Sequence, residues 1–185
     1  MNAKWTFSAL VLVALSAGAA AASPDDDAWE PYRFLVGEWT GEGGGEPGNG
    51  LGRFSFAWEL QEKVLVRRNR AEYPAVRGRP AFSHEDLMVI YRADRGGPTK
   101  AIYFDSEGHV INYAVTFSND RRTLTFLSNA VPAAARFRLA YTKGADDSMG
   151  IKFEIAPPVK LSGFKTYLEG DARRQTEPKP GRPKS

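Results

Sequence analysis

Apolar and polar residues alternate along most of the chain, and this period of two restricts the fold more than any other feature. Between residues 53 and 60, Phe54, Phe56 and Trp58 alternate with small or polar side chains. Such alternation is typical of an antiparallel strand with one buried face. It predicts strands over residues 36–43, 53–60, 63–73, 84–93, 99–106, 109–118, 122–129, 135–143, 148–156 and 164–174.

The segments between these strands are short and rich in turn-forming residues, as in 95–98 and 118–120. They leave no room for the helical crossovers that parallel strands need. Closure would remove the exposed edges of such a sheet. We therefore predict an all-β fold, a single antiparallel up-and-down β-barrel of about eight to ten strands with a short N-terminal helical turn. A β-sandwich and an open meander are the alternatives.

The first residues have the composition of an export signal. Lys4 precedes an apolar stretch over residues 5–15, and Ala20 to Ala22 fit a cleavage site before Ser23. This pattern predicts a signal peptide over residues 1–22 and a periplasmic or secreted protein, with no stable membrane insertion. An uncleaved N-terminal anchor is the alternative. We divide the rest into a linker, 23–33, the barrel, 34–174, and a basic proline-rich tail, 175–185, expected to be disordered.

The basic character of the chain comes from its ends. The formal net charge is +3, yet residues 173–185 alone hold five basic residues and one acid. The body between the signal and the tail is slightly acidic, so we predict no nucleic-acid partner; the oligomeric state stays open. The chain has no cysteine, which excludes disulfides, zinc–thiolate sites and a cysteine nucleophile.

Two predicted turns place the candidate ligand residues. A tight turn at 61–62 would put Arg67 on the apolar, inward face, where it could bind an anionic group of a ligand. The structural alternatives are a one-residue shift that turns Arg67 outward and an internal partner such as Glu72 or Glu169. A two-residue turn at Glu107 and Gly108 would pair Phe104 with Ile111 and point Asp105 away from His109. The predicted lumen lining is Phe54, Phe56, Trp58, Arg67, Phe104, His109, Ile111, Tyr113 and Phe117.

The segment FLVGEWTGEG, residues 34–43, resembles the start of calycin barrels, the lipocalin, fatty-acid-binding-protein and nitrobindin-like group, and in particular bacterial domains of unknown function. The resemblance implies that Trp39 packs across the closed end and is covered by a basic side chain of the last strand, here Arg174. Nitrobindins hold haem through a histidine near the end of the chain. This chain has only His84 and His109, so we predict no haem and no other cofactor.

Few residues are available for chemistry, and no familiar catalytic motif is present. We interpret His84, Glu85 and Asp86 as a solvated strand entrance rather than a metal site, and residues 41–52 as a flexible glycine-rich loop. The sequence thus predicts an exported, non-catalytic barrel that binds a small apolar or amphipathic molecule in its lumen. The alternatives are a cavity enzyme with His109 as general base and an envelope interaction protein that uses its outer face or tail.

Overall fold

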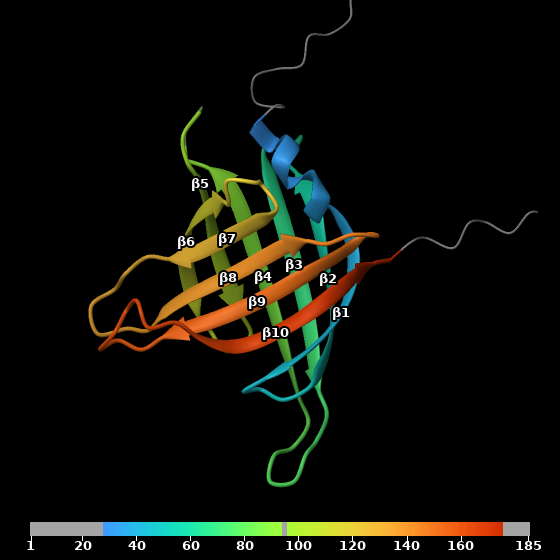
Figure 1. The fold of residues 1–185 in the computed structure, drawn as a ribbon, viewed down its shortest axis with the longest axis vertical. Helices are drawn as coiled ribbons and strands as arrows, with labels where there is room; N and C mark the ends of the chain where they lie inside the picture. The colour runs from blue at the N-terminus through green and yellow to red at the C-terminus, as the bar shows by residue number, and fades with distance from the viewer. Residues whose placement is uncertain (1–27, 94–95, 176–185) are drawn as a thin grey trace, which may run out of the picture.

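Ten antiparallel strands close into a barrel in the computed structural model, which describes residues 28–93 and 96–175 (Figure 1). The predicted signal peptide and nearly all of the predicted tail lie outside these residues. The elements are η1 (Glu30–Leu35), β1 (Gly37–Gly45), β2 (Gly50–Glu59), β3 (Val64–Tyr73), β4 (Phe82–Arg92), β5 (Thr99–Asp105), β6 (Val110–Phe117), β7 (Thr123–Ser128), β8 (Arg136–Lys143), β9 (Ser148–Ala156) and β10 (Lys165–Arg174).

Each strand pairs with its neighbours in sequence, and β1 pairs with β10 to close the sheet. The closing register sets Trp39 opposite Arg174, and the backbone N–H of Gln175 donates to the carbonyl of Glu38 at 2.8 Å. This confirms the predicted up-and-down barrel and excludes the sandwich and the open meander. Among the described residues, no helix is long and apolar enough to cross a membrane.

The glycine-rich segment 41–52 is mostly strand, so its interpretation as a flexible loop was wrong. Gly41 to Gly43 pair with Gly50 to Gly52 across β1 and β2. Small residues are needed because β10 lies close against β1. A Cβ on Gly170 would collide with the Glu42 carbonyl oxygen, and one on Gly43 would lie 2.8 Å from that of Glu169. Glycine therefore allows the first and last strands to approach.

The helix η1 covers one end of the barrel, the upper end in Figure 1, and we call this the closed end. The opposite, distal end holds the connections β1–β2, β3–β4, β5–β6, β7–β8 and β9–β10. Trp29 and Tyr32, which the predicted boundary assigns to the linker, are 4% and 5% exposed and join the core. The Tyr32 hydroxyl donates to Thr99 Oγ1 at 2.9 Å. The segment before the barrel is thus part of its packing.

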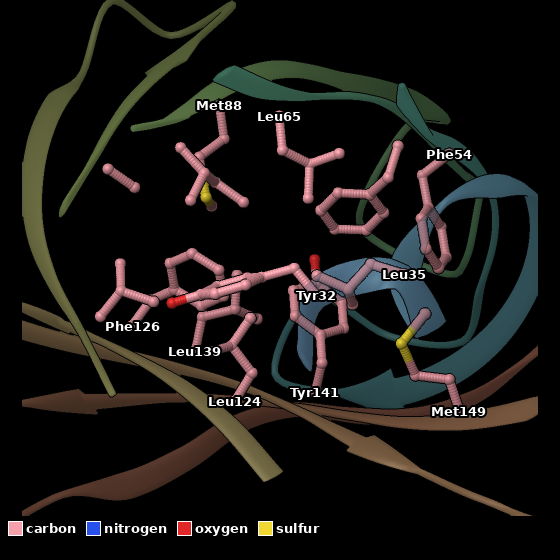
Figure 2. Packing of buried hydrophobic residues seen from close by; sticks show 14 of the residues in the cluster. Tyr32, Leu35, Phe54, Leu65, Met88, Leu124, Phe126, Leu139, Tyr141 and Met149 are labelled. Carbon is pink, nitrogen blue, oxygen red and sulfur yellow. The ribbon is translucent and has the colours of Figure 1, made fainter. Parts of the chain in front are cut away.

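Inward side chains from opposite walls meet below η1 and fill this part of the lumen. Figure 2 shows Leu65 and Met88 reaching in from one wall toward Tyr141 and Leu139 on the other. Leu65, Met88 and Tyr141 are fully buried. Aromatic edges also meet, since the Phe56 and Tyr141 rings are 5.5 Å apart at 86°. This half of the barrel is a packed core.

The closed end carries the contact that the calycin resemblance implies. The Arg174 guanidinium carbon lies 4.3 Å from the centroid of the Trp39 ring. Arg174 also donates hydrogen bonds to the carbonyl oxygens of Phe34 and Val36. The Trp39 indole N–H donates to the Leu35 carbonyl at 2.7 Å. Trp39 on β1 and Arg174 on β10 thus fasten η1 to the first and last strands of the sheet.

The β5–β6 hairpin differs from its prediction by one residue. Phe104 pairs with Val110 and Tyr103 with Ile111, where the two-residue turn required Phe104 opposite Ile111. The connection contains a third residue because the Asp105 carboxylate accepts hydrogen bonds from the backbone N–H groups of Glu107 and His109. A shift of one residue exchanges the two faces of a strand. Phe104 therefore faces outward and Asp105 inward.

Candidate functional site

The predicted lumen residues other than Arg67 separate into three groups. Phe54, Phe56 and Tyr113 are 1 to 4% exposed and belong to the packed core, against which Trp58, Ile111 and Phe117 are packed. Phe104 is 42% exposed on the outer face, so its inward placement was wrong. His109 shares the face of Ile111, as predicted, but lies at the distal end with 62% of its side chain exposed.

Arg67 points inward, as predicted, and forms an ion pair with Asp86. The β2–β3 register that places it, with Phe56 opposite Arg67, is also as predicted. Arg67 thus has an internal partner, as the structural alternative held, but the partner is Asp86 and neither Glu72 nor Glu169. The second oxygen of Asp86 accepts a hydrogen bond from Asn69 at 2.8 Å. Burial alone would lower the pKa of Arg67, but the Asp86 carboxylate raises it. The positive charge of Arg67 is therefore already balanced by Asp86 within the protein.

His84 lies at the start of β4, between three polar partners at the distal end. Its Nδ1 is 2.9 Å from Glu107 Oε2, and its Nε2 is 3.0 Å from the Tyr103 hydroxyl and 3.3 Å from Asp86 Oδ2. The Asp86 carboxylate and, against the effect of burial, Glu107 raise the pKa of His84 to about 9. The imidazole is half-buried and fixed in orientation, unlike a solvated strand entrance.

The second histidine is also held by a carboxylate. His109 Nδ1 lies 2.8 Å from Asp105 Oδ2, whereas the predicted turn pointed these side chains apart. Only 6% of the Asp105 side chain is exposed. Burial opposes ionisation of Asp105, but the backbone and side-chain hydrogen bonds from His109 lower its pKa below the usual value. His84 with Glu107 and His109 with Asp105 thus lie together at the distal end, where β4, β5 and β6 are neighbours.

These residues could be found only in part from the sequence. Phe82, His84, Asp86, Met88 and Ile90 share one phase of the alternation, so His84 and Asp86 are expected on the inward face together. Their partners come from β3 and from the β5–β6 connection. Asp105 and Glu107 were interpreted as a polar hairpin tip and Tyr103 as aromatic core, because the predicted hairpin register turned Tyr103 and Asp105 away from the lumen.

A groove of about 910 Å³ opens at the distal end between the β1–β2 hairpin and the β3–β4 connection. We call it the rim groove. Its apolar part contains Tyr73 and Phe82, whose rings stack with centroids 4.6 Å apart, and Leu51, which is 64% exposed. Its polar part includes the ion pair of Arg70 with Glu72. The full lining is Glu42, Gly43, Asn49, Gly50, Leu51, Arg70, Glu72, Tyr73, Pro74, Ala81, Phe82 and Ser83. None of the predicted ligand residues is among them.

Comparisons with known proteins give a fold likeness alone. No family model matches the sequence, and no curated protein was found to be related. One similar solved structure is described as "De novo design of a fluorescence-activating beta barrel". It shares 14% sequence identity with this chain at a TM-score of 0.41, and the match covers 77% of this chain and 95% of that one. The barrel assignment therefore depends on the strand pairing itself.

Proposed function

We propose that this protein binds a small amphipathic molecule in the rim groove at the distal end of the barrel, as a binding protein rather than an enzyme. The observation that carries the proposal is the groove itself, which combines an exposed apolar surface with charged side chains. Small-molecule sites are typically concave, mainly apolar and about 300 to 1,000 Å³ in volume. The predicted signal peptide supports binding outside the cytoplasm.

The site differs from the lumen predicted from sequence because the two ends of the barrel are packed differently. Below η1 the inward side chains are large and fully buried, as for Trp39 and Phe126. At the distal end the facing positions of β1 and β2 are glycines, such as Gly43 and Gly50. Gly50 lies against the buried Tyr73 ring, where a Cβ would be 2.6 Å from Tyr73 Cε1. The Phe82 ring stacked on Tyr73 stays 38% exposed and forms the open apolar part of the groove.

The charges of the groove favour a ligand with a neutral or cationic polar end. Glu42 and Glu72 contribute two carboxylates to the described lining, and Arg70 contributes a guanidinium. Arg70 is held by Glu72 at 3.1 Å and also pairs with Glu85. It is therefore less available to an anion than an unpaired arginine would be. Arg67, the predicted anion-binding residue, is likewise paired and lies outside the groove.

The catalytic alternative has a partial geometric basis. His109 has the polar partner within about 3 Å that a positioned base requires. However, most of its side chain is exposed to solvent and it does not line the groove. A general base acts best where water is excluded and the reacting atoms are held. We therefore favour binding.

Fluorescent amphiphiles test the proposal directly. We would titrate the protein with two dansyl-labelled probes, one a long-chain amine and one a long-chain carboxylic acid, and follow the rise in dansyl emission. Leu51→Lys places a charged side chain in the groove. Val110→Lys is the matched control, because Val110 is 62% exposed on another strand and lies outside the groove.

We expect the amine probe to bind the parent protein more tightly than the acid probe. Leu51→Lys should weaken amine binding by about tenfold, whereas Val110→Lys should leave it unchanged, since loss of apolar contact and added repulsion both act only in the groove. Equal loss in both variants, or no saturable binding of either probe, would overturn the proposal.

A further inference from the structure

We propose that His84, Asp105 and Glu107 form a binding site for a divalent transition-metal ion of the zinc class at the distal end of the barrel. The proposal is independent of the rim groove, because none of the three residues lines it. It also reverses the interpretation of His84 as part of a solvated strand entrance.

The three ligand atoms already lie near one another. One ligand atom from each of His84, Asp105 and Glu107 lies within 4.8 Å of the ligand atoms of the other two residues. Ligand atoms around a tetrahedral zinc lie roughly 3.3 Å apart, since each is about 2.0 to 2.2 Å from the metal. His84 Nδ1 and Glu107 Oε2 are already 2.9 Å apart. The cluster is therefore close to the spacing that one ion needs.

The orientation of His84 is the second observation that points to a metal. A ligating histidine usually donates its other ring N–H to a carboxylate or another acceptor, which fixes the ring. His84 Nε2 lies 3.0 Å from the Tyr103 hydroxyl and 3.3 Å from Asp86 Oδ2, so Nδ1 is directed toward Glu107. Asp86 is in turn fixed by Arg67 and Asn69.

The local charges suit a doubly charged ion. Arg67 pairs with Asp86, so the charges nearest the ion would be the carboxylates of Glu107 and of Asp105, which also contacts His109 Nδ1 at 2.8 Å. One imidazole with two carboxylates is a mixed donor set that zinc accepts readily, whereas calcium and magnesium prefer oxygen ligands alone. Three protein ligands would leave a coordination position for water, and 45% of the Glu107 side chain is exposed to solvent.

The backbone keeps the two carboxylates beside β4. The N–H of Ser106 donates to the Glu85 carbonyl at 2.9 Å, and the N–H of Glu85 donates to Ser106 Oγ at 3.2 Å. These two bonds fasten the residue between Asp105 and Glu107 next to His84. Both acids are therefore held at the site before any ion binds.

Zinc chloride is the probe for the test. The untagged full chain, first treated with a chelator, would be titrated by isothermal calorimetry, and cobalt absorption spectra would report the coordination. His84→Gln and Glu107→Gln each remove one ligand. Glu85→Gln is the matched control, because Glu85 is a neighbouring carboxylate, 57% exposed, that is not in the cluster. Thermal melts of each variant would verify folding.

We expect one zinc ion per chain, bound at least about tenfold more weakly by His84→Gln and by Glu107→Gln and equally well by Glu85→Gln. Bound cobalt should show visible bands that both ligand variants lose. Absence of zinc binding, or binding that survives in a folded His84→Gln or Glu107→Gln variant, would overturn the proposal. Leu51→Lys should retain zinc, so failure of the groove and failure of the metal site are distinguishable.

Discussion

Arg67 on β3 and Asp86 on β4 form an ion pair inside the barrel, with 9% and 4% of their side chains exposed. Aromatic rings surround the guanidinium, whose carbon lies 5.6 Å from the Phe54 centroid and 5.9 Å from that of Tyr141. Both ions have lost most of their water, and each depends on the other to compensate for that loss. The pair joins the packed core at the closed end to the polar cluster at the distal end.

Breaking this pair should destabilise the protein strongly. We expect Asp86→Leu or Arg67→Met alone to lower the free energy of unfolding by about 3 to 5 kcal/mol, because each leaves an unpaired buried charge. The double variant should lose much less than the sum of the two. Urea unfolding followed by tryptophan fluorescence measures all three. Arg68→Met, at a site that is 58% exposed, should change little, and additive losses would contradict the coupling.

Removing Arg174 should loosen the closed end. Arg174→Ala removes the contact with the Trp39 ring and the hydrogen bonds to Phe34 and Val36. We expect a loss of about 2 to 3 kcal/mol and a changed near-ultraviolet circular dichroism spectrum of the aromatic residues. Arg173→Ala is the control, since that residue is exposed. Equal effects of the two variants would show that Arg174 acts only through its charge.

Adding a methyl group at the closure should separate β1 from β10. In Gly170→Ala the new Cβ would collide with the Glu42 carbonyl oxygen and lie 2.7 Å from the Gly43 Cα, so the backbone must move. We expect a loss of about 1 to 3 kcal/mol and faster amide hydrogen exchange in β1. Gly52→Ala, whose nearest neighbour would be 3.8 Å away, should be nearly neutral. Unchanged exchange in Gly170→Ala would refute this role of glycine.

The pair of Arg138 and Glu154 should make part of the stability depend on pH. The hydrogen bond from Arg138 lowers the pKa of Glu154 in the folded protein, against the effect of burial. A carboxyl group whose pKa is lowered by folding stabilises the fold at pH values above its unfolded pKa of about 4.3. This contribution disappears as the pH falls through the folded pKa.

Glu154→Gln should therefore lower the free energy of unfolding by about 1 kcal/mol or less at about pH 7, and by almost nothing at about pH 2. Urea unfolding at both values measures the difference. Glu169→Gln is the control, because Glu169 is 64% exposed and lies 3.9 Å from its cation, Lys152. A loss in Glu154→Gln that stays constant with pH would mean that the side chain acts by packing instead.

The strands could be predicted from sequence because burial of one face imposes a period of two on each of them. All ten appear near their expected ranges, and the β2–β3 register follows from the matching of apolar positions such as Trp58 and Leu65. The β5–β6 register could not be predicted in this way. The hydrogen bonds of the Asp105 carboxylate to the backbone add a residue to the connection, and alternation alone does not record them.

The partner of Arg67 illustrates what limits prediction of the site. Its inward direction follows from alternation, but the choice of Asp86 depends on the β3–β4 register across the long connection 74–81. The cluster around His84 likewise combines three strands whose relative positions are set only once the sheet has formed. Sequence reasoning therefore located the inward face of Arg67 but not the residue that pairs with it.

Closure of β1 on β10 also sets the order in which the chain can complete its fold. One edge of β1 pairs with β2, but its other edge finds a partner only when residues 165–174 have been synthesised, so β1 and the newest strand each keep an unpaired edge until then. Such edges can pair with other chains. The protein is therefore most exposed to aggregation just before its last strand emerges, and a chain that ends before β10 keeps that exposure permanently.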